Sequence, residues 1–129
     1  MIPHIPGKTP RPTAPVRPGL DEGRALYAKG FFWEAHEAWE PVWLAAAPNS
    51  RERAFLQGII QLANARLKLA MGRHEAAARI VARAGEHLDA AGLPGAGRCG
   101  QDWAQGELME IRAILEHGYM HYNAISSQR

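Results

Sequence analysis

One stretch of the sequence decides the fold, and it reads Phe31-Phe32-Trp33-Glu34-Ala35-His36-Glu37-Ala38-Trp39-Glu40-Pro41-Val42-Trp43. It gathers aromatic side chains, carboxylates and a histidine within a few helical turns. At 100° per residue, its apolar side chains fall in one arc of about 120°. They are Phe31, Phe32, Ala35, Trp39, Val42 and Trp43. The stretch therefore predicts an amphipathic helix that packs its aromatic face against the rest of the chain.

Helical periodicity continues on both sides of this stretch. Apolar residues recur at helical spacing in residues 20–29, 50–71, 74–90 and 102–117. Residues 50–71 carry apolar side chains around most of their circumference, which is typical of a central, buried helix. We find no alternation in the sequence that indicates a β-strand. The pattern predicts an all-α fold, a single compact bundle of about five helices arranged as antiparallel helical hairpins.

The two ends of the chain depart from this pattern. Residues 1–19 are rich in proline, which fixes φ and removes a backbone donor, so they predict an extended arm draped over the surface. Residues 20–117 form the predicted helical domain. Gly118 is expected to close its last helix, which leaves residues 118–129 as a C-terminal tail. A glycine-rich loop is expected over residues 91–100.

Composition excludes several classes of protein. Lys and Arg total 15 against 13 Asp and Glu, and the net charge of +2 is too small to indicate nucleic acid or an anionic membrane. The single cysteine, Cys99, excludes an intramolecular disulfide and a cysteine-based zinc cage. We find no signal peptide and no apolar run long enough to span a membrane. A cytoplasmic protein without a cofactor is therefore expected.

The expected central helix carries a polar stripe. At helical spacing its members fall within about 60° of one another, and they are Gln57, Gln61, Asn64 and Lys68. Across the helix pair, this stripe would satisfy Glu34, His36 or Glu40 of the preceding helix. Buried polar groups need partners, so the two rows predict a hydrogen-bonded network that fixes the register of the helix pair. Arg66 lies on another face and needs a carboxylate or an exit to solvent.

The same residues admit a metal site. His36, Glu37 and Glu40 spell His-Glu-x-x-Glu, one residue away from the His-Glu-x-x-His of zinc metalloproteases. His36 and Glu40, one helical turn apart, are the weak candidates for two metal ligands. Glu37, Gln61 or Asn64 would have to supply the others, and amide side chains are poor zinc ligands.

Two linked motifs resemble a known family. They are Phe32 with Glu34-Ala35-His36-Glu37, Glu40 and Trp43, followed by Gly58-Ile59-Ile60-Gln61-Leu62-Ala63. Over roughly residues 26–88 the chain resembles the bacterial and archaeal family known as domain of unknown function 309. The resemblance implies a small all-α fold and an uncharacterised activity, with no established catalytic residue. Where such sequences often have a histidine late in the central helix, this chain has Lys68, which weakens the metal hypothesis.

Three functional hypotheses follow. The first is a non-enzymatic binding module that holds a peptide, a protein or a small ligand beside the second and third helices. Its candidate site residues are Glu34, His36, Glu37, Glu40, Trp43, Gln57, Gln61, Asn64 and Lys68. The second is a metal-dependent hydrolase that uses His36, Glu37 and Glu40. The third, a nucleic-acid accessory protein, would use Lys8, Arg11 and Arg17 of the arm. Homo-oligomers are compatible with each hypothesis.

Overall fold

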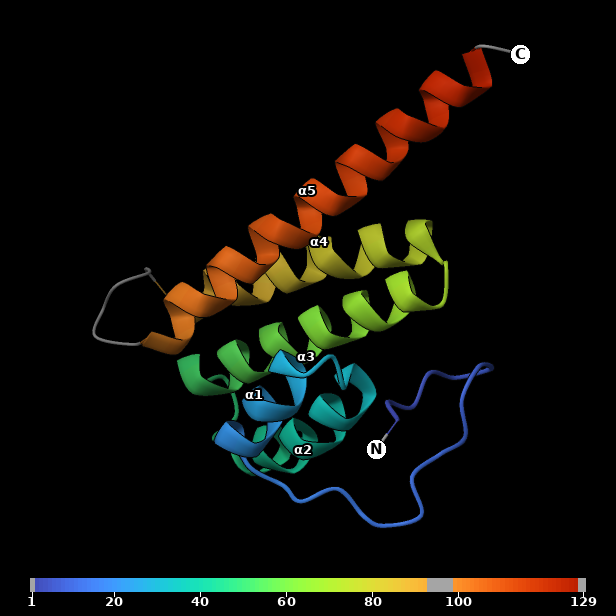
Figure 1. The fold of residues 1–129 in the computed structure, drawn as a ribbon. Helices are drawn as coiled ribbons and strands as arrows, with labels where there is room; N and C mark the ends of the chain where they lie inside the picture. The colour runs from blue at the N-terminus through green and yellow to red at the C-terminus, as the bar shows by residue number, and fades with distance from the viewer. Residues whose placement is uncertain (1, 93–98, 128–129) are drawn as a thin grey trace.

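In the part of the chain that the structure describes, there are five helices and no strand. The computed structural model describes residues 2–92 and 99–127. Its elements are α1 (Leu20–Ala28), α2 (Phe32–Ala45), α3 (Arg51–Ala70), α4 (His74–Ala91) and α5 (Cys99–Ser127). The helices α1 and α2 form one hairpin, α3 and α4 form another, and α5 lies along α3 and α4 (Figure 1). The predicted all-α bundle of helical hairpins is confirmed.

Both hairpins turn at glycine. Gly30 between α1 and α2 has a φ of 86°, and Gly72 between α3 and α4 has a φ of 77°. Only glycine adopts this left-handed conformation without steric penalty, which is why helices so often end at one. The sequence places both helix ends correctly.

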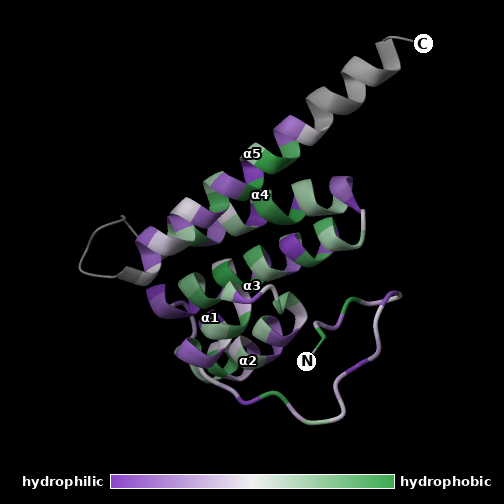
Figure 2. Cartoon of the chain, viewed as in Figure 1, coloured by the Kyte–Doolittle hydropathy of each residue, from purple (hydrophilic) through white to green (hydrophobic). Residues whose placement is uncertain are grey.

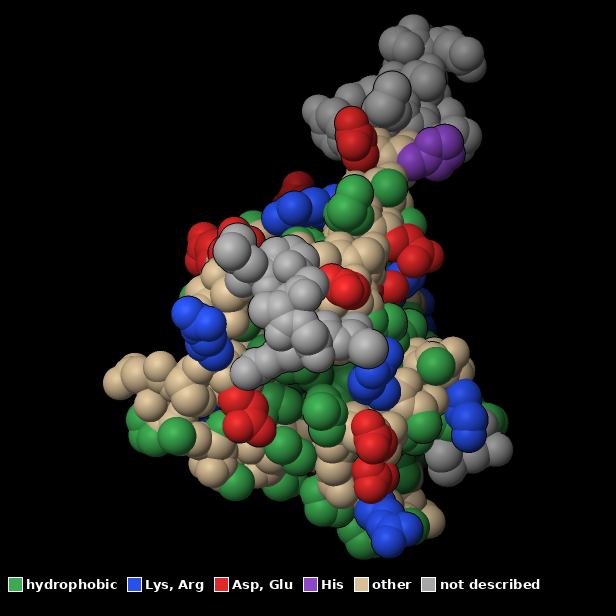
Figure 3. Space-filling model, turned by 90° about the vertical axis from the view of Figure 1, so that its left-hand side faces the viewer, with side chains coloured by type: hydrophobic (Ala, Val, Ile, Leu, Met, Phe, Trp, Pro, Cys, Tyr) green, Lys and Arg blue, Asp and Glu red, His purple; other side chains and the backbone are tan. Residues whose placement is uncertain are grey.

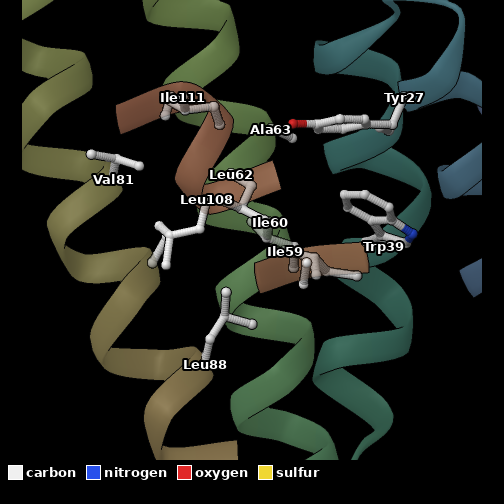
Figure 4. Packing of buried hydrophobic residues seen from close by; sticks show 14 of the residues in the cluster. Tyr27, Trp39, Ile59, Ile60, Leu62, Ala63, Val81, Leu88, Leu108 and Ile111 are labelled. Carbon is white, nitrogen blue, oxygen red and sulfur yellow. The ribbon is translucent and has the colours of Figure 1, made fainter. Parts of the chain in front are cut away.

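The helix α3 is the centre of the molecule, because α2, α4 and α5 all pack against it. Its buried apolar residues cover most of its circumference, and they are Leu56, Ile59, Ile60, Leu62, Ala63, Ala65 and Leu67. Side chains of the other helices converge on them, including Trp39 from α2, Leu88 from α4 and Ile111 from α5 (Figure 4). Figure 2 shows hydrophobic and hydrophilic residues mixed along the helices, as expected for amphipathic helices. Burial of these side chains from water is the main force that holds the bundle together.

Two glycines inside helices allow neighbouring elements to approach closely. A Cβ atom at Gly23 of α1 would clash with the indole of Trp39, and one at Gly58 of α3 would lie 2.6 Å from Cδ2 of Leu88. The fully buried indole of Trp39 also donates a hydrogen bond to the carbonyl of Leu20 at 3.0 Å. The hairpin of α1 and α2 is therefore locked by one tryptophan of the opening stretch.

The start of α3 is close to the predicted residue 50, whereas α5 differs from the prediction at both ends. Ser50 caps α3, and its hydroxyl accepts from the backbone N–H of Arg53 at 3.0 Å. Helix α5 begins at Cys99 rather than near Asp102, and it continues through Gly118 to Ser127. One glycine lowers helix stability by only about 1 kcal/mol relative to alanine, so it does not by itself end a long helix. Of the expected loop over residues 91–100, residues 93–98 lie outside the described part of the chain.

The N-terminal arm is extended and fixed to the bundle at both ends. Near its start, His4 is buried, and its backbone N–H donates to Oε2 of Glu34 in α2 at 2.9 Å. Nζ of Lys8 donates to the carbonyl of Ala70 at the end of α3. Near its end, the N–H of Gly19 donates to the carbonyl of Ala38. The arm therefore contacts α2 and α3 near its start and reaches the bundle again where it joins α1 (Figure 1).

The surface carries both signs of charge. Acidic and basic side chains are interspersed over the face that Figure 3 presents. None of the helices in the described residues is long and apolar enough to cross a membrane.

Candidate functional site

The candidate site begins at His36, which contacts both of its expected partners. Its Nδ1 lies 2.9 Å from Oδ1 of Asn64 in α3, and its Nε2 lies 3.0 Å from Oε2 of Glu40, one turn further along α2. The side chain of His36 is 27% exposed and that of Glu40 is 45% exposed. The predicted contact between the polar rows of α2 and α3 is therefore confirmed at one pair, His36 with Asn64.

This arrangement defines the tautomer of the histidine. The side-chain oxygen of Asn64 can only accept a hydrogen bond, so Nδ1 of His36 carries a proton and donates it. In a neutral imidazole, Nε2 then presents a lone pair to the carboxylate of Glu40. Two acceptors 3.0 Å apart repel each other unless a proton or a cation lies between them. The histidine is thus oriented by α3, and a proton or a cation at Nε2 would join it to the carboxylate of Glu40.

A third group completes this cluster. One ligand atom each from His36, Glu37 and Glu40 lie within 4.8 Å of one another. The sequence offered Glu37 as one of three possible further ligands, and its carboxylate lies close to His36 and Glu40 here. We call His36, Glu37 and Glu40 the α2 cluster. With two carboxylates and one imidazole, it has the donor set of a divalent metal site.

Glu34 does not belong to the α2 cluster. Its side chain is buried, with 2% exposure, and faces the N-terminal arm, where Oε2 accepts the N–H of His4. Of the three residues that the stripe of α3 was expected to satisfy, it contacts His36, whereas Glu34 is satisfied by the arm. The neighbour that covers Glu34 is a segment without periodicity, whose position only the folded chain reveals.

The other predicted site residues lie outside the α2 cluster. Within the described residues, the half-buried side chains of Gln57, Gln61 and Lys68 form no side-chain hydrogen bond with the α2 cluster. Trp43, at the C-terminal end of α2, packs under the guanidinium of Arg53, whose Cζ lies 4.8 Å from the ring centroid. The nine candidate residues therefore divide into a cluster with one α3 partner, a separate buried carboxylate and a set of packing residues.

A second polar cluster joins α1, α3 and α5, and Arg66 is the one member that the sequence pointed to. The carboxylate of Glu107 in α5 accepts from Nε of Arg66 at 2.7 Å and from the hydroxyl of Tyr27 at 2.5 Å. Glu110 lies 3.5 Å from Nη2 of the same arginine. Arg66 was expected to need a carboxylate or an exit to solvent, and the structure gives it a carboxylate. The sequence does contain a signal for the partner of Arg66, because Glu107 lies one turn before Ile111 on the inward side of α5.

Burial and these contacts shift two pKa values. Burial raises the pKa of Tyr27 well above its usual range, and the hydrogen bond to the negatively charged Glu107 raises it further. Burial alone would lower the pKa of Arg66, but its contacts with Tyr27 and Glu107 outweigh that effect and raise it. Tyr27 is therefore a neutral donor and Arg66 a permanent cation in the folded protein.

These observations define a class of protein, a small all-helical bundle with a polar cluster on the surface of its second helix. The family model "Domain of unknown function (DUF309)" matches residues 20–80. The chain belongs to this family, so the resemblance noted in the sequence is confirmed. The matched residues contain α1, α2 and α3, and with them the whole α2 cluster and Asn64.

A solved structure supports the same assignment. The crystal structure of the conserved hypothetical protein TTHA0068 from Thermus thermophilus is similar, with 30% sequence identity and a TM-score of 0.59. The similarity covers 74% of this chain and 97% of that one. No curated protein matches the sequence.

Proposed function

We propose that this protein is a small binding module that holds a divalent transition-metal ion at the α2 cluster. The observation that carries the proposal is the convergence of the ligand atoms of His36, Glu37 and Glu40 within 4.8 Å of one another. Of the ligand classes considered from the sequence, a small cationic ligand suits this cluster best, because its two carboxylates have no cation among the contacts described above.

Geometry favours an ion that accepts nitrogen and oxygen ligands. Zinc bonds to such atoms are about 2.0–2.2 Å long, so a tetrahedral site holds its ligand atoms about 3.4 Å apart. The α2 cluster is slightly wider than that. Small rotamer changes of the partly exposed glutamates would close the difference, and exposure leaves the remaining coordination positions to water.

Asn64 supports the proposal as an orienting residue. Metal-bound histidines usually donate their other ring N–H to an oxygen acceptor, which fixes the tautomer and the ring orientation. Here Nδ1 of His36 donates to Asn64, and Nε2 faces Glu40. The amide of Asn64 thus has a role as a hydrogen-bond acceptor behind the metal ligand, although it is a poor ligand itself.

The test is a metal titration of untagged protein that has been stripped with a chelator. We expect one Zn²⁺ or Mn²⁺ ion per chain by isothermal titration calorimetry, and a higher thermal midpoint in the presence of the ion. His36→Ala and Glu40→Gln should weaken binding at least about tenfold. His74→Ala and Glu52→Gln change the same residue types at exposed positions outside the α2 cluster and should leave the affinity unchanged.

Two outcomes would contradict the proposal. One is that the natural protein binds no metal at concentrations up to about 1 mM, because a specific site has a dissociation constant below that concentration. The other is an unchanged affinity in His36→Ala when circular dichroism shows that this variant is folded.

A further inference from the structure

The N-terminal arm and the first two helices surround a cavity of about 800 Å³. The arm contributes Ile2 and residues 10–17, and the helices contribute Glu22, Leu26 and Glu34. Small-molecule sites usually have volumes of about 300–1,000 Å³ and a mostly apolar lining with a few polar groups. This cavity has that size and that composition.

A buried carboxylate with a free oxygen lines the cavity. Glu34 is 2% exposed, and only its Oε2 accepts a hydrogen bond, from the N–H of His4. Its Oε1 is buried and has no hydrogen-bond partner within the described residues. A buried charged acceptor without a donor is destabilising, whereas an ammonium group would give it a short, charge-assisted hydrogen bond.

Two arginines line the same cavity. Arg11 is positioned by Trp33 of α2, with its Cζ 5.8 Å from the ring centroid, and Arg17 lies further along the arm. Together with Glu22 and Glu34, the lining therefore carries two side chains of each sign. The remaining lining side chains are mostly apolar, and they include Pro10, Pro12, Ala14, Pro15, Val16 and Leu26. A simple cation would be repelled by the arginines, whereas a ligand with both charges and an apolar body complements the whole lining.

The cavity is bounded by a segment that is held at its ends. A turn closed by Thr9, whose hydroxyl accepts from the N–H of Ile5 at 2.6 Å, lies before the lining segment. The bond from Gly19 to Ala38 lies after it. Residues 10–17 thus run between two fixed points, and their movement could admit a ligand without disturbing the helices.

We infer that this cavity binds a small zwitterionic amine with an apolar side chain, a ligand of the α-amino acid class. Its ammonium group pairs with the carboxylate of Glu34, and its own carboxylate contacts Arg11 or Arg17. The site shares no residue with the α2 cluster, so the two proposals stand or fall separately.

The experiment compares ligands on the full chain, with a chelator present so that the α2 cluster holds no metal. L-Leucine and L-phenylalanine are titrated by calorimetry beside N-acetyl-L-leucine, which lacks the ammonium group, and L-leucinamide, which lacks the carboxylate. We expect leucine or phenylalanine to bind, and each modified compound to bind at least about tenfold more weakly. Absence of binding by both amino acids up to about 10 mM would overturn the inference. Leucinamide that binds as tightly as leucine would overturn the role of the arginines.

Variants then locate the ligand. Glu34→Gln keeps an acceptor for the N–H of His4 but removes the charge, and it should weaken leucine binding at least about tenfold. The double variant Arg11→Gln, Arg17→Gln should do the same. Arg24→Gln is the matched control, because Arg24 lies over the ring of Trp103 instead of lining the cavity. Equal affinity in the natural protein and folded Glu34→Gln would overturn the inference, and the ligand comparison remains decisive if Glu34→Gln does not fold.

Discussion

The central helix makes two polar contacts that differ in how completely their charges are paired. Arg66 of α3 meets Glu107 and Glu110 of α5, and Glu107 also accepts from Tyr27. Asn64 of α3 meets the α2 cluster, where a histidine and two carboxylates lie together and no Lys or Arg of the described residues forms an ion pair with them. The first contact joins helices by mutual neutralisation. The second leaves two negative charges at a partly exposed surface.

This difference separates structural polar residues from candidate functional ones. A buried ion pair that is fully hydrogen-bonded has no donor or acceptor left for a ligand, and removal of one member leaves an isolated buried charge. An incompletely paired cluster at a surface has little effect on folding but is ready for a ligand. Substitutions on the two sides of α3 test this contrast through stability and through binding.

The largest expected effect is that of Glu107→Ala. The side chain of Glu107 is 10% exposed, and its removal leaves Arg66 and the hydroxyl of Tyr27 without their shared acceptor. We expect the free energy of unfolding in urea to fall by about 3–5 kcal/mol. Glu110→Ala is the matched control, because that side chain is 63% exposed, and it should lower stability by less than about 1 kcal/mol. Equal losses in the two variants would contradict the contrast.

Tyr27→Phe should have the next largest effect on stability. This change keeps the ring and its packing but removes the hydroxyl that donates to Glu107. A hydrogen bond to a charged group contributes about 1.5–3 kcal/mol, and urea unfolding at neutral pH should show a loss of that size. A variant as stable as the natural protein would show that Arg66 alone satisfies Glu107.

Asn64→Ala sharpens the other half of the comparison. It removes the acceptor that orients His36 but leaves all three members of the α2 cluster in place. We expect the affinity for Zn²⁺ to fall by about 10–100-fold, because orienting groups behind metal ligands have effects of that size. Gln57→Ala is a suitable control on the same helix. If Asn64→Ala binds zinc as tightly as the natural protein, the histidine is oriented by α2 alone.

The smallest effect is an alkaline loss of stability through Tyr27. Its pKa is raised in the folded protein, so above about pH 10 the unfolded chain releases this proton while the folded chain keeps it. The unfolded state then binds fewer protons, and the free energy of unfolding should fall by about 1.4 kcal/mol per pH unit from this group. Urea unfolding between about pH 8 and 11 should show a shallower fall in Tyr27→Phe than in the natural protein. Parallel curves would show that other groups dominate.

Much of the fold is predictable because it depends on local periodicity. The apolar positions of α3 surround that helix, so the order of its residues alone indicates that it is central. Glycines at the turns and prolines in the arm act through their own backbone geometry, so Gly30, Gly72 and residues 1–19 behave as expected. Gly118 is the exception, because one glycine weakens a long helix without ending it.

The candidate site is predictable only in part. The pairing of His36 with Asn64 follows from two polar stripes that face each other across a helix pair. The membership of Glu37 does not follow from such a pattern, because long side chains move their charges several ångströms from the position that the backbone assigns. Partner choice between distant segments is also invisible to periodicity, and Arg66 illustrates it, since the sequence demanded a carboxylate without identifying Glu107.

The sequence by itself determined the helices, the central position of α3 and the presence of a polar cluster on α2. Those features depend on residues a few positions apart, where spacing and backbone preference suffice. Only the tertiary structure decided that Glu34 faces the arm, that residues 10–17 and α1 line a cavity beside it, and that Tyr27 and Arg66 share Glu107. The three hydrogen bonds join residues that are 30 or more positions apart, and their geometry is set by the packing of whole helices and the path of the arm.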